Sequence, residues 1–167
     1  MKKIVLGDCF RGDYQPILVV DDNHGSVDRC YLLSDLAGRS MYMLDDEILK
    51  REPLPTLHLP IKKEWFDLIL SGVMKEEYRG LTTFYKSRLV EKGSIVAGCE
   101  AKNIPFQFVT IPKVIHLTNG YGNHCRQLWA KIESITVGKG NPEWGAPDCD
   151  VFRIHLGEVF HTKNVVK

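Results

Sequence analysis

Residues 51–60, REPLPTLHLP, decide how the chain is organised. Pro53, Pro55 and Pro60 each push the preceding residue toward an extended backbone and oppose helix formation. We therefore expect this segment to be an ordered linker between two regions. The boundary is placed after residue 54, which divides the chain into residues 1–54 and residues 55–167.

The first region has the pattern of a small all-β domain. Strand-like runs at 3–10, 16–21, 29–33 and 40–44 are separated by turn-forming residues. The acidic stretch 45–50 then resembles one helical turn, with its negative charges at the positive end of the helix dipole. Several short strands in about fifty residues predict a strongly bent, barrel-like sheet.

The second region combines helices with longer strands. Helical periodicity covers 62–71 and 82–91, where Gly72 is expected to end the first helix and Thr82 or Thr83 to cap the second. Strands are predicted at 94–98, at 106–117 with a break at Pro112, and at 128–137 with a bulge near Ser134. A further strand is predicted at 151–156, where alternation places Phe152, Ile154 and Leu156 inward. Two helices followed by mostly antiparallel strands indicate an α+β barrel.

Composition excludes several classes of protein. The chain has 167 residues, of which 44% are hydrophobic, and a formal net charge of +1. This apolar content supports a folded core and argues against a disordered chain. No uninterrupted apolar run approaches about 20 residues, so we expect no membrane span and, without a signal sequence, a cytoplasmic location.

Neither the cysteines nor the histidines have the spacing of a metal site. The five cysteines are odd in number and lack a Cys-x-x-Cys pair, so they are expected to be reduced thiols. The six histidines are scattered and are expected on the surface. We therefore predict no metal and no cofactor.

Charge differs between the two ends of the chain. Residues 1–60 carry seven basic and ten acidic side chains, whereas residues 61–167 carry fifteen and eleven. A mildly basic second region supports a short phosphate contact, but binding a long duplex needs a dense basic stripe.

A family signal lies in the segment 65–79, where a tryptophan-bearing helix leads into Ser-Gly and then into Glu-x-Arg. It resembles the ASCH domain of the PUA-like superfamily, whose usual core is Gly-x-Lys-x-x-Glu-x-Arg. Gly72, Glu77 and Arg79 match this core, whereas Met74 stands at the lysine position. Segments 119–121 and 138–145 are similar to segments of short bacterial and phage ASCH proteins.

The resemblance implies a PUA-like β-barrel with flanking helices and a cleft for RNA, a nucleotide or a modified nucleoside. Some relatives are acetylcytidine amidohydrolases, in which the motif lysine performs the chemistry, and others are reported as ribonucleases. A thioether cannot transfer a proton, so with Met74 at that position a catalytic amine would have to come from Lys75.

If the segment after Gly72 is a strand, alternation places Lys75, Glu77 and Arg79 on one face. Arg79 could then pair with a phosphate, while Glu77 accepts hydrogen bonds from a base or ribose. Two flanking cations should lower the pKa of Glu77. The alternative is a solvated strand face whose ion pairs contribute little.

Two further pairs are candidates for ligand contacts. Tyr85 and Arg88, three residues apart on a helix, could form a stacking platform beside a phosphate contact, or simply an ordinary helix face. Asn119 and Tyr121 lie in a glycine-punctuated turn that could reach a base or be only a hairpin turn. The loop at 138–145 is expected to fold over the mouth of the barrel, with Trp144 packed as a lid.

We favour a module that binds RNA or a nucleotide, as a single strand or small ligand, in a mildly basic cleft. The candidate ligand-binding residues are Lys75, Glu77, Arg79, Tyr85, Arg88, Asn119 and Tyr121, of which Lys75 and Glu77 are the catalytic candidates. One alternative is a hydrolase acting on RNA or a modified nucleoside. The other is a bacterial or phage protein-interaction or inhibitor module, whose N-terminal region binds a protein partner.

Overall fold

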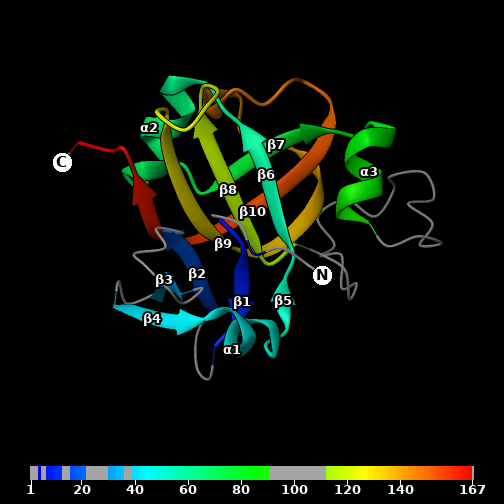
Figure 1. Ribbon diagram of the computed structural model, residues 1–167. Coiled ribbons are helices and arrows are strands. Elements are labelled where there is room, and N and C mark those ends of the chain that lie inside the picture. Colours follow the sequence, from blue (N-terminus) through cyan, green and yellow to red (C-terminus); the bar gives the residue numbers. More distant parts are fainter. Residues whose placement is uncertain are drawn as a thin grey trace.

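The computed structural model describes residues 4, 7–12, 16–21, 30–35, 39–90 and 112–166. Within these residues the protein is a mixed α+β fold, built mostly of strands in two five-stranded sheets (Figure 1). The strand predicted at 94–98 and the first part of the one predicted at 106–117 lie outside the described residues.

The first sheet has the strand order β4-β3-β2-β1-β5, and its paired strands are antiparallel. Its strands are β1 (Cys9–Arg11), β2 (Pro16–Asp21), β3 (Cys30–Asp35), β4 (Ser40–Leu44) and β5 (Pro53–Leu54). Helix α1 (Asp45–Leu49) follows β4, and the Glu47 carboxylate accepts a hydrogen bond from the Leu44 N–H at 3.2 Å. The strands predicted at 16–21 and 40–44, and the helical turn after them, are confirmed.

The second sheet has the order β6-β8-β9-β10-β7. Its strands are β6 (Thr56–Pro60), β7 (Glu76–Gly80), β8 (Val114–Asn119), β9 (Arg126–Lys139) and β10 (Asp150–Lys163). β6 pairs with β8 in parallel, whereas the other pairs are antiparallel. The sequence-based expectation of mostly antiparallel pairing is therefore correct.

Two helices follow the edge strands of the second sheet, and both were predicted. Helix α2 (Lys63–Leu70) follows β6 and ends before Gly72, whose φ of 77° is a conformation that glycine adopts without strain. Helix α3 (Thr83–Leu89) follows β7, and Thr82 Oγ1 caps it by accepting a hydrogen bond from the Tyr85 N–H at 3.4 Å. A short 3-10 helix, η1 (Pro142–Trp144), lies between β9 and β10.

The expectation that residues 51–60 are a linker is wrong, because most of them are strand. β5 pairs with β1 in the first sheet, β6 pairs with β8 in the second, and only Pro55 lies between them. Both are edge strands, where a proline without an N–H is tolerated. The same prolines that oppose helix therefore favour extended pairing. The division of the chain into two domains at residue 54 stays a prediction.

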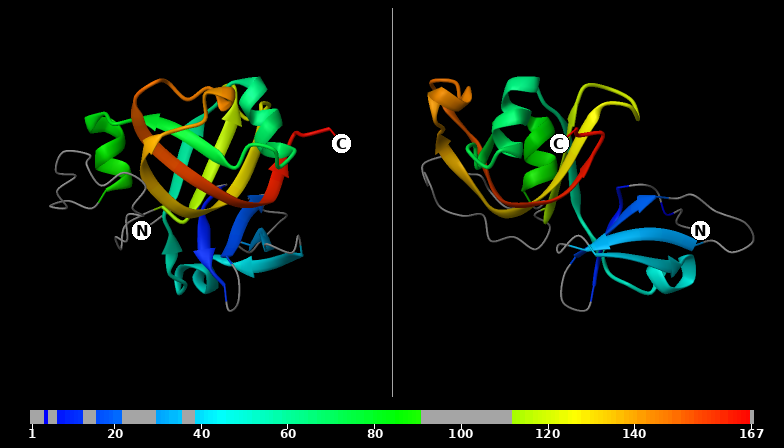
Figure 2. Two further views of the ribbon diagram at one scale, coloured as in Figure 1. Left: turned by 180° about the vertical axis from the view of Figure 1, so that it is seen from behind. Right: turned by 90° about the vertical axis from the view of Figure 1, so that its left-hand side faces the viewer.

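The barrels expected for the two regions are not confirmed, because backbone pairing among the described strands leaves both sheets open. β4 and β5 are the edges of the first sheet, and β6 and β7 are the edges of the second. The second sheet curves strongly around its core (Figure 2). A side chain joins its two edges, because Arg79 Nη2 on β7 donates a hydrogen bond to the Pro60 carbonyl oxygen on β6 at 3.0 Å.

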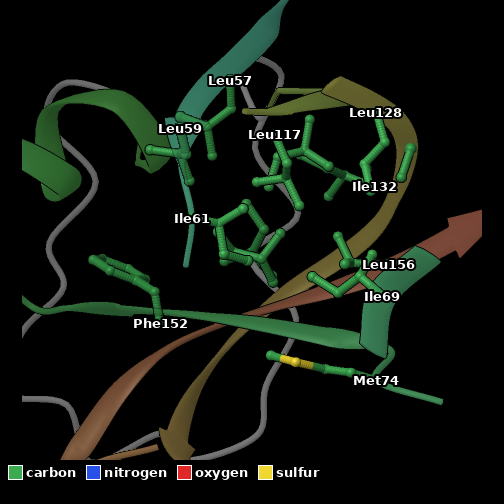
Figure 3. Packing of buried hydrophobic residues seen from close by; sticks show 14 of the residues in the cluster. Leu57, Leu59, Ile61, Ile69, Met74, Leu117, Leu128, Ile132, Phe152 and Leu156 are labelled. Atoms are coloured by element: carbon green, nitrogen blue, oxygen red, sulfur yellow. The ribbon is translucent and has the colours of Figure 1, made fainter. Parts of the chain in front are cut away.

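The main core fills the concave side of this curved sheet (Figure 3). Alternation along β10 is confirmed, since Phe152, Ile154 and Leu156 are all buried. Phe66 and Ile69 are the buried residues of α2, whereas Trp65 and Leu68 are only partly buried against the core. Each large apolar side chain buried in this way contributes about 1.5–3 kcal/mol.

The bulge predicted near Ser134 is confirmed. His155 pairs with Ser134 and Leu156 pairs with Ile132, so Glu133 is the extra residue on β9. Two more register shifts follow on β10 before His161. Bulges increase local twist and bend the strand, which accounts for the curvature of this long hairpin.

A smaller cluster packs the two sheets against each other. Cys9 and Leu18 come from the first sheet, and Val114, Trp129 and Phe160 come from the second. Trp129 is 2% exposed.

No helix in the described parts of the chain is long and apolar enough to cross a membrane.

Candidate functional site

Glu77 and Arg79 lie on β7 with their side chains on the concave, core-facing side of the second sheet. In register with β10, Glu77 is opposite Ile154 and Arg79 is opposite Phe152, both of which belong to the core. Glu77 is only 5% exposed. Strand alternation thus places a charged pair where the flanking positions hold apolar side chains.

The two side chains form a close ion pair. Arg79 Nη2 lies 2.6 Å from Glu77 Oε1 and also donates to the Pro60 carbonyl oxygen. The guanidinium carbon lies 5.8 Å from the centroid of the Tyr85 ring, which is partly buried on α3. Among the described residues the buried Arg79 Nε has no hydrogen-bond partner. The structure therefore brings together Glu77, Arg79 and Tyr85.

Burial raises the pKa of Glu77 to about 7, although the neighbouring Arg79 guanidinium lowers it. The sequence-based expectation of a lowered pKa is wrong, because removing the carboxylate from water outweighs the attraction of a single cation. A carboxyl with this pKa is present in both forms at neutral pH. It can accept hydrogen bonds when ionised and donate one when protonated.

Lys75 does not join this pair. It precedes β7, which begins at Glu76, and its side chain is exposed. It lines a hollow of about 450 Å³ that also includes Glu133 and Glu158, and within the described residues it forms no ion pair with Glu77. The row predicted by alternation is therefore correct for Glu77 and Arg79 and wrong for Lys75, because the strand starts after it.

Met74, at the lysine position of the ASCH-like motif, is 2% exposed and belongs to the main core (Figure 3). It packs with the end of α2 rather than facing solvent. The thioether is therefore a core side chain in this fold.

Tyr85 and Arg88 do not form the platform that their spacing suggested. Tyr85 faces Arg79, whereas the Arg88 guanidinium carbon lies 3.6 Å from the centroid of the exposed Phe84 ring. Arg88 Nη1 also donates to the Phe84 carbonyl oxygen at 3.0 Å. The spacing of three residues on α3 was read correctly as helical, but the partner of Arg88 is one turn back on its own helix.

Asn119 and Tyr121 also separate. Asn119 Nδ2 donates to the Ile61 carbonyl oxygen at 3.2 Å, and its Oδ1 accepts from Arg126 Nη2 at 3.1 Å. Asn119 thus holds the end of β8 to the chain that leaves β6. Tyr121 is 91% exposed in the turn between β8 and β9. Within the described structure, neither of these residues forms a hydrogen bond with Arg79, which pairs with Glu77 and Pro60.

The opposite face of β7 carries a second charged network that sequence reasoning did not identify. Glu76 accepts hydrogen bonds from Arg153 Nη2 at 2.7 Å and from the Tyr78 hydroxyl at 2.8 Å. Burial by itself raises the pKa of Glu76. The two hydrogen bonds and the nearby positive charges outweigh burial, so the pKa is lowered overall. Burial raises the pKa of Tyr78 to about 12, so this hydroxyl stays protonated.

The loop predicted at 138–145 packs over this second network. The Asn141 N–H donates to the Tyr78 hydroxyl at 3.0 Å, and a Cβ at Gly145 would come within 2.6 Å of the Trp65 ring. Trp144 is partly buried against the main core. The loop is therefore ordered by its contacts. Gly140 and Gly145 are required by the close approach of the Tyr78 and Trp65 rings.

A row of aromatic side chains crosses the second sheet and was missed because strand pairing creates it. His58 on β6, His116 on β8, Trp129 on β9 and His161 on β10 are direct neighbours in register. The expectation that the histidines are simply surface residues is wrong for His116, which is half-buried and stacked on Trp129. No short-range spacing in the sequence indicates this arrangement.

Comparison of the chain with protein-family models, with curated proteins and with solved structures found no match.

Proposed function

We propose that this protein binds RNA, a nucleotide or a modified nucleoside at the group formed by Glu77, Arg79 and Tyr85. The observation that carries the proposal is the ion pair between the buried Glu77 and the partly buried Arg79, with Arg79 Nε left without a partner among the described residues. A buried charge pair is costly to maintain, and breaking one by removing a partner is strongly destabilising. Such pairs are often retained where they act on a ligand.

The three side chains offer complementary contacts to a nucleoside. Arg79 provides fixed N–H donors, Glu77 provides a carboxyl that can accept or donate, and Tyr85 provides a ring on which a base can stack. The pair is nearly neutral when Glu77 is ionised, which favours the base and sugar over a run of phosphates. A single strand or small ligand fits this chemistry better than a long duplex.

The resemblance to ASCH domains supports the same choice of residues. Gly72, Glu77 and Arg79 are the positions at which the chain agrees with the family core, and the last two form the buried pair. A PUA-like, barrel-related architecture stays part of this proposal. The strongly curved second sheet, whose edges Arg79 joins, is compatible with it.

The proposal is tested by fluorescence anisotropy with a labelled single-stranded RNA, and by competition with the four nucleoside monophosphates. Arg79→Lys keeps the charge but loses the forked donor geometry, so it should weaken binding by about tenfold or more. The matched control is Arg153→Lys. Arg153 pairs with Glu76 at 2.7 Å and its side chain is 22% exposed, against 2.6 Å and 19% for Arg79.

Equal affinity of Arg79→Lys and the parent protein would overturn the proposed site. So would an equal loss in Arg153→Lys, because that side chain belongs to the opposite face of the sheet. Far-UV circular dichroism and thermal unfolding of both variants separate a loss of contact from a loss of fold.

A hydrolase acting on RNA or a modified nucleoside is a second candidate, and the raised pKa of Glu77 favours it. A carboxyl with a pKa of about 7 suits a proton carrier at neutral pH. Lys75 lies apart, so Glu77 would act without it. Turnover of short RNA or acetylated cytidine that is abolished in Glu77→Gln and retained in Lys75→Ala would support this candidate. Absence of turnover at high protein concentration would exclude it for those substrates.

A further inference from the structure

The histidine row provides two imidazole nitrogens that lie close enough to share one ion. His58 and His116 are directly opposite each other on the parallel strands β6 and β8, and their Nδ1 atoms are 2.9 Å apart. The two rings are nearly perpendicular, at 85°. These residues belong to the face that carries Trp129, and they take no part in the Glu77–Arg79 group.

The hydrogen bonds of His116 fix which of its nitrogens is free to bind. His116 Nε2 lies 2.9 Å from Gln127 Oε1, an amide oxygen that can only accept, so Nε2 carries the proton. Nδ1 of His116 therefore has an unprotonated lone pair, which now accepts the Nδ1–H of His58. Gln127 is 6% exposed and holds this tautomer from within the sheet.

The His116 ring is also held in orientation. It stacks on the buried Trp129 with ring centroids 4.0 Å apart and planes inclined by 6°. An imidazole whose Nε2–H is held by an acceptor and whose Nδ1 is unprotonated has the usual arrangement of a histidine that ligates a metal.

We propose that His58 and His116 bind a divalent transition-metal ion of the Ni(II) or Cu(II) class through their Nδ1 atoms. Metal–imidazole bonds of about 2.0–2.1 Å at 90° place two nitrogens about 2.9 Å apart, whereas tetrahedral angles require about 3.3 Å. The observed separation is that of neighbouring positions in octahedral or square-planar coordination. The site is thus suited to Ni(II) or Cu(II) rather than to tetrahedral zinc.

Binding requires a change of tautomer at His58 and a turn of its ring, so that both Nδ1 lone pairs point at the metal. Its proton leaves Nδ1 and is replaced by one at Nε2, so the ring stays neutral and the metal takes both Nδ1 lone pairs. His58 is exposed, which gives the ring room to turn and lets water complete the coordination. Asp8 acts on His58 electrostatically, and its negative charge favours a cation here.

The protein contributes two ligands to this site. In the described part of the chain, no cluster of three or more His, Cys, Asp or Glu side chains could hold a metal ion. The site is therefore an open one, in which several positions on the metal belong to water or to an external ligand.

The test uses the 167-residue chain and Ni(II) alone, because the thiols of the chain could reduce Cu(II). Isothermal titration calorimetry should show a binding event that His58→Ala and His116→Ala each weaken at least tenfold. His124→Ala is the matched control, since His124 is an exposed histidine in the turn between β8 and β9, and this variant should bind as the parent does. Any site made by cysteines persists in all three variants.

A second measurement remains informative if His116→Ala unfolds. Paramagnetic Ni(II) should broaden the ring signals of His58 and His116 at lower concentrations than those of His124. Unchanged affinity in His58→Ala, or broadening that begins at His124, would overturn the proposal. Tighter binding of Zn(II) than of Ni(II) at this pair would overturn the assigned 90° geometry.

Discussion

The carboxyl of Glu77 should make the protein less stable as the pH rises from 5 to 8. Burial raises its pKa to about 7, from an ordinary value of 4.5. Between these two values the folded state holds a proton that the unfolded chain has released. The stabilisation is fully present below pH 4.5 and is lost as the pH rises through 7.

The size of the effect follows from the two pKa values. One pKa unit corresponds to about 1.36 kcal/mol, so Glu77 alone should lower the free energy of unfolding by about 2 to 3 kcal/mol between pH 5 and pH 8. Other groups titrate in the same range. The quantity to measure is therefore the difference between the parent protein and Glu77→Gln, whose side chain is neutral and close in shape to the protonated acid.

Urea unfolding of both proteins at pH 5, 6, 7 and 8 gives this difference directly. The parent protein should lose about 2 to 3 kcal/mol relative to Glu77→Gln across the series. The control is Glu76→Gln on the opposite face. Its carboxyl has a lowered pKa, so its contribution is lost only in more acidic solution and its difference should stay flat from pH 5 to 8. A flat or rising difference for Glu77→Gln would show that Arg79 keeps the carboxylate ionised and would refute the reasoning.

Two further substitutions test the packing around the site, both by urea unfolding. Gly145→Ala should cost about 1 to 3 kcal/mol more than Gly72→Ala. The two glycines have φ values of 80° and 77°, but only at Gly145 would the added Cβ meet Trp65, so equal costs would contradict the close approach. Met74→Ala should lower the free energy of unfolding by about 2 to 5 kcal/mol, since Met74 is 2% exposed. Val73 is 57% exposed, so Val73→Ala should change the free energy of unfolding by about 0.5 kcal/mol or less. Similar losses at positions 73 and 74 would show that the segment leading into β7 is placed wrongly.

Local patterns in the sequence were enough to predict most of the strands and helices. The alternation of Phe152, Ile154 and Leu156 placed the inner face of β10, and Thr82 and Gly72 marked helix ends. These features depend on neighbours within one or two turns of chain. The prolines of 51–60 were also read correctly as opposing helix, but which strands they pair with depends on residues far away in the sequence.

The candidate site was predicted only in part, for the same reason. Alternation placed Glu77 and Arg79 together, but the depth of burial that raises the pKa of Glu77 arises from packing across the sheet. Lys75 was misplaced because the start of β7 is set by its pairing with β10. The hydrogen bond from Arg79 to Pro60 joins residues nineteen positions apart in the sequence, and no spacing rule predicts it.

The position of Pro55, the one residue between β5 and β6, limits what truncation experiments on this protein can show. A shortened chain that starts at residue 55 loses the first sheet and with it Cys9 and Leu18, which cover Val114, Trp129 and Phe160. The newly exposed apolar surface would promote self-association of the shortened chain. If the shortened chain no longer binds a partner, the cause could therefore be aggregation rather than a missing recognition surface. Point substitutions on the outer edge of the first sheet, such as at the 75% exposed Tyr42, would separate these two outcomes.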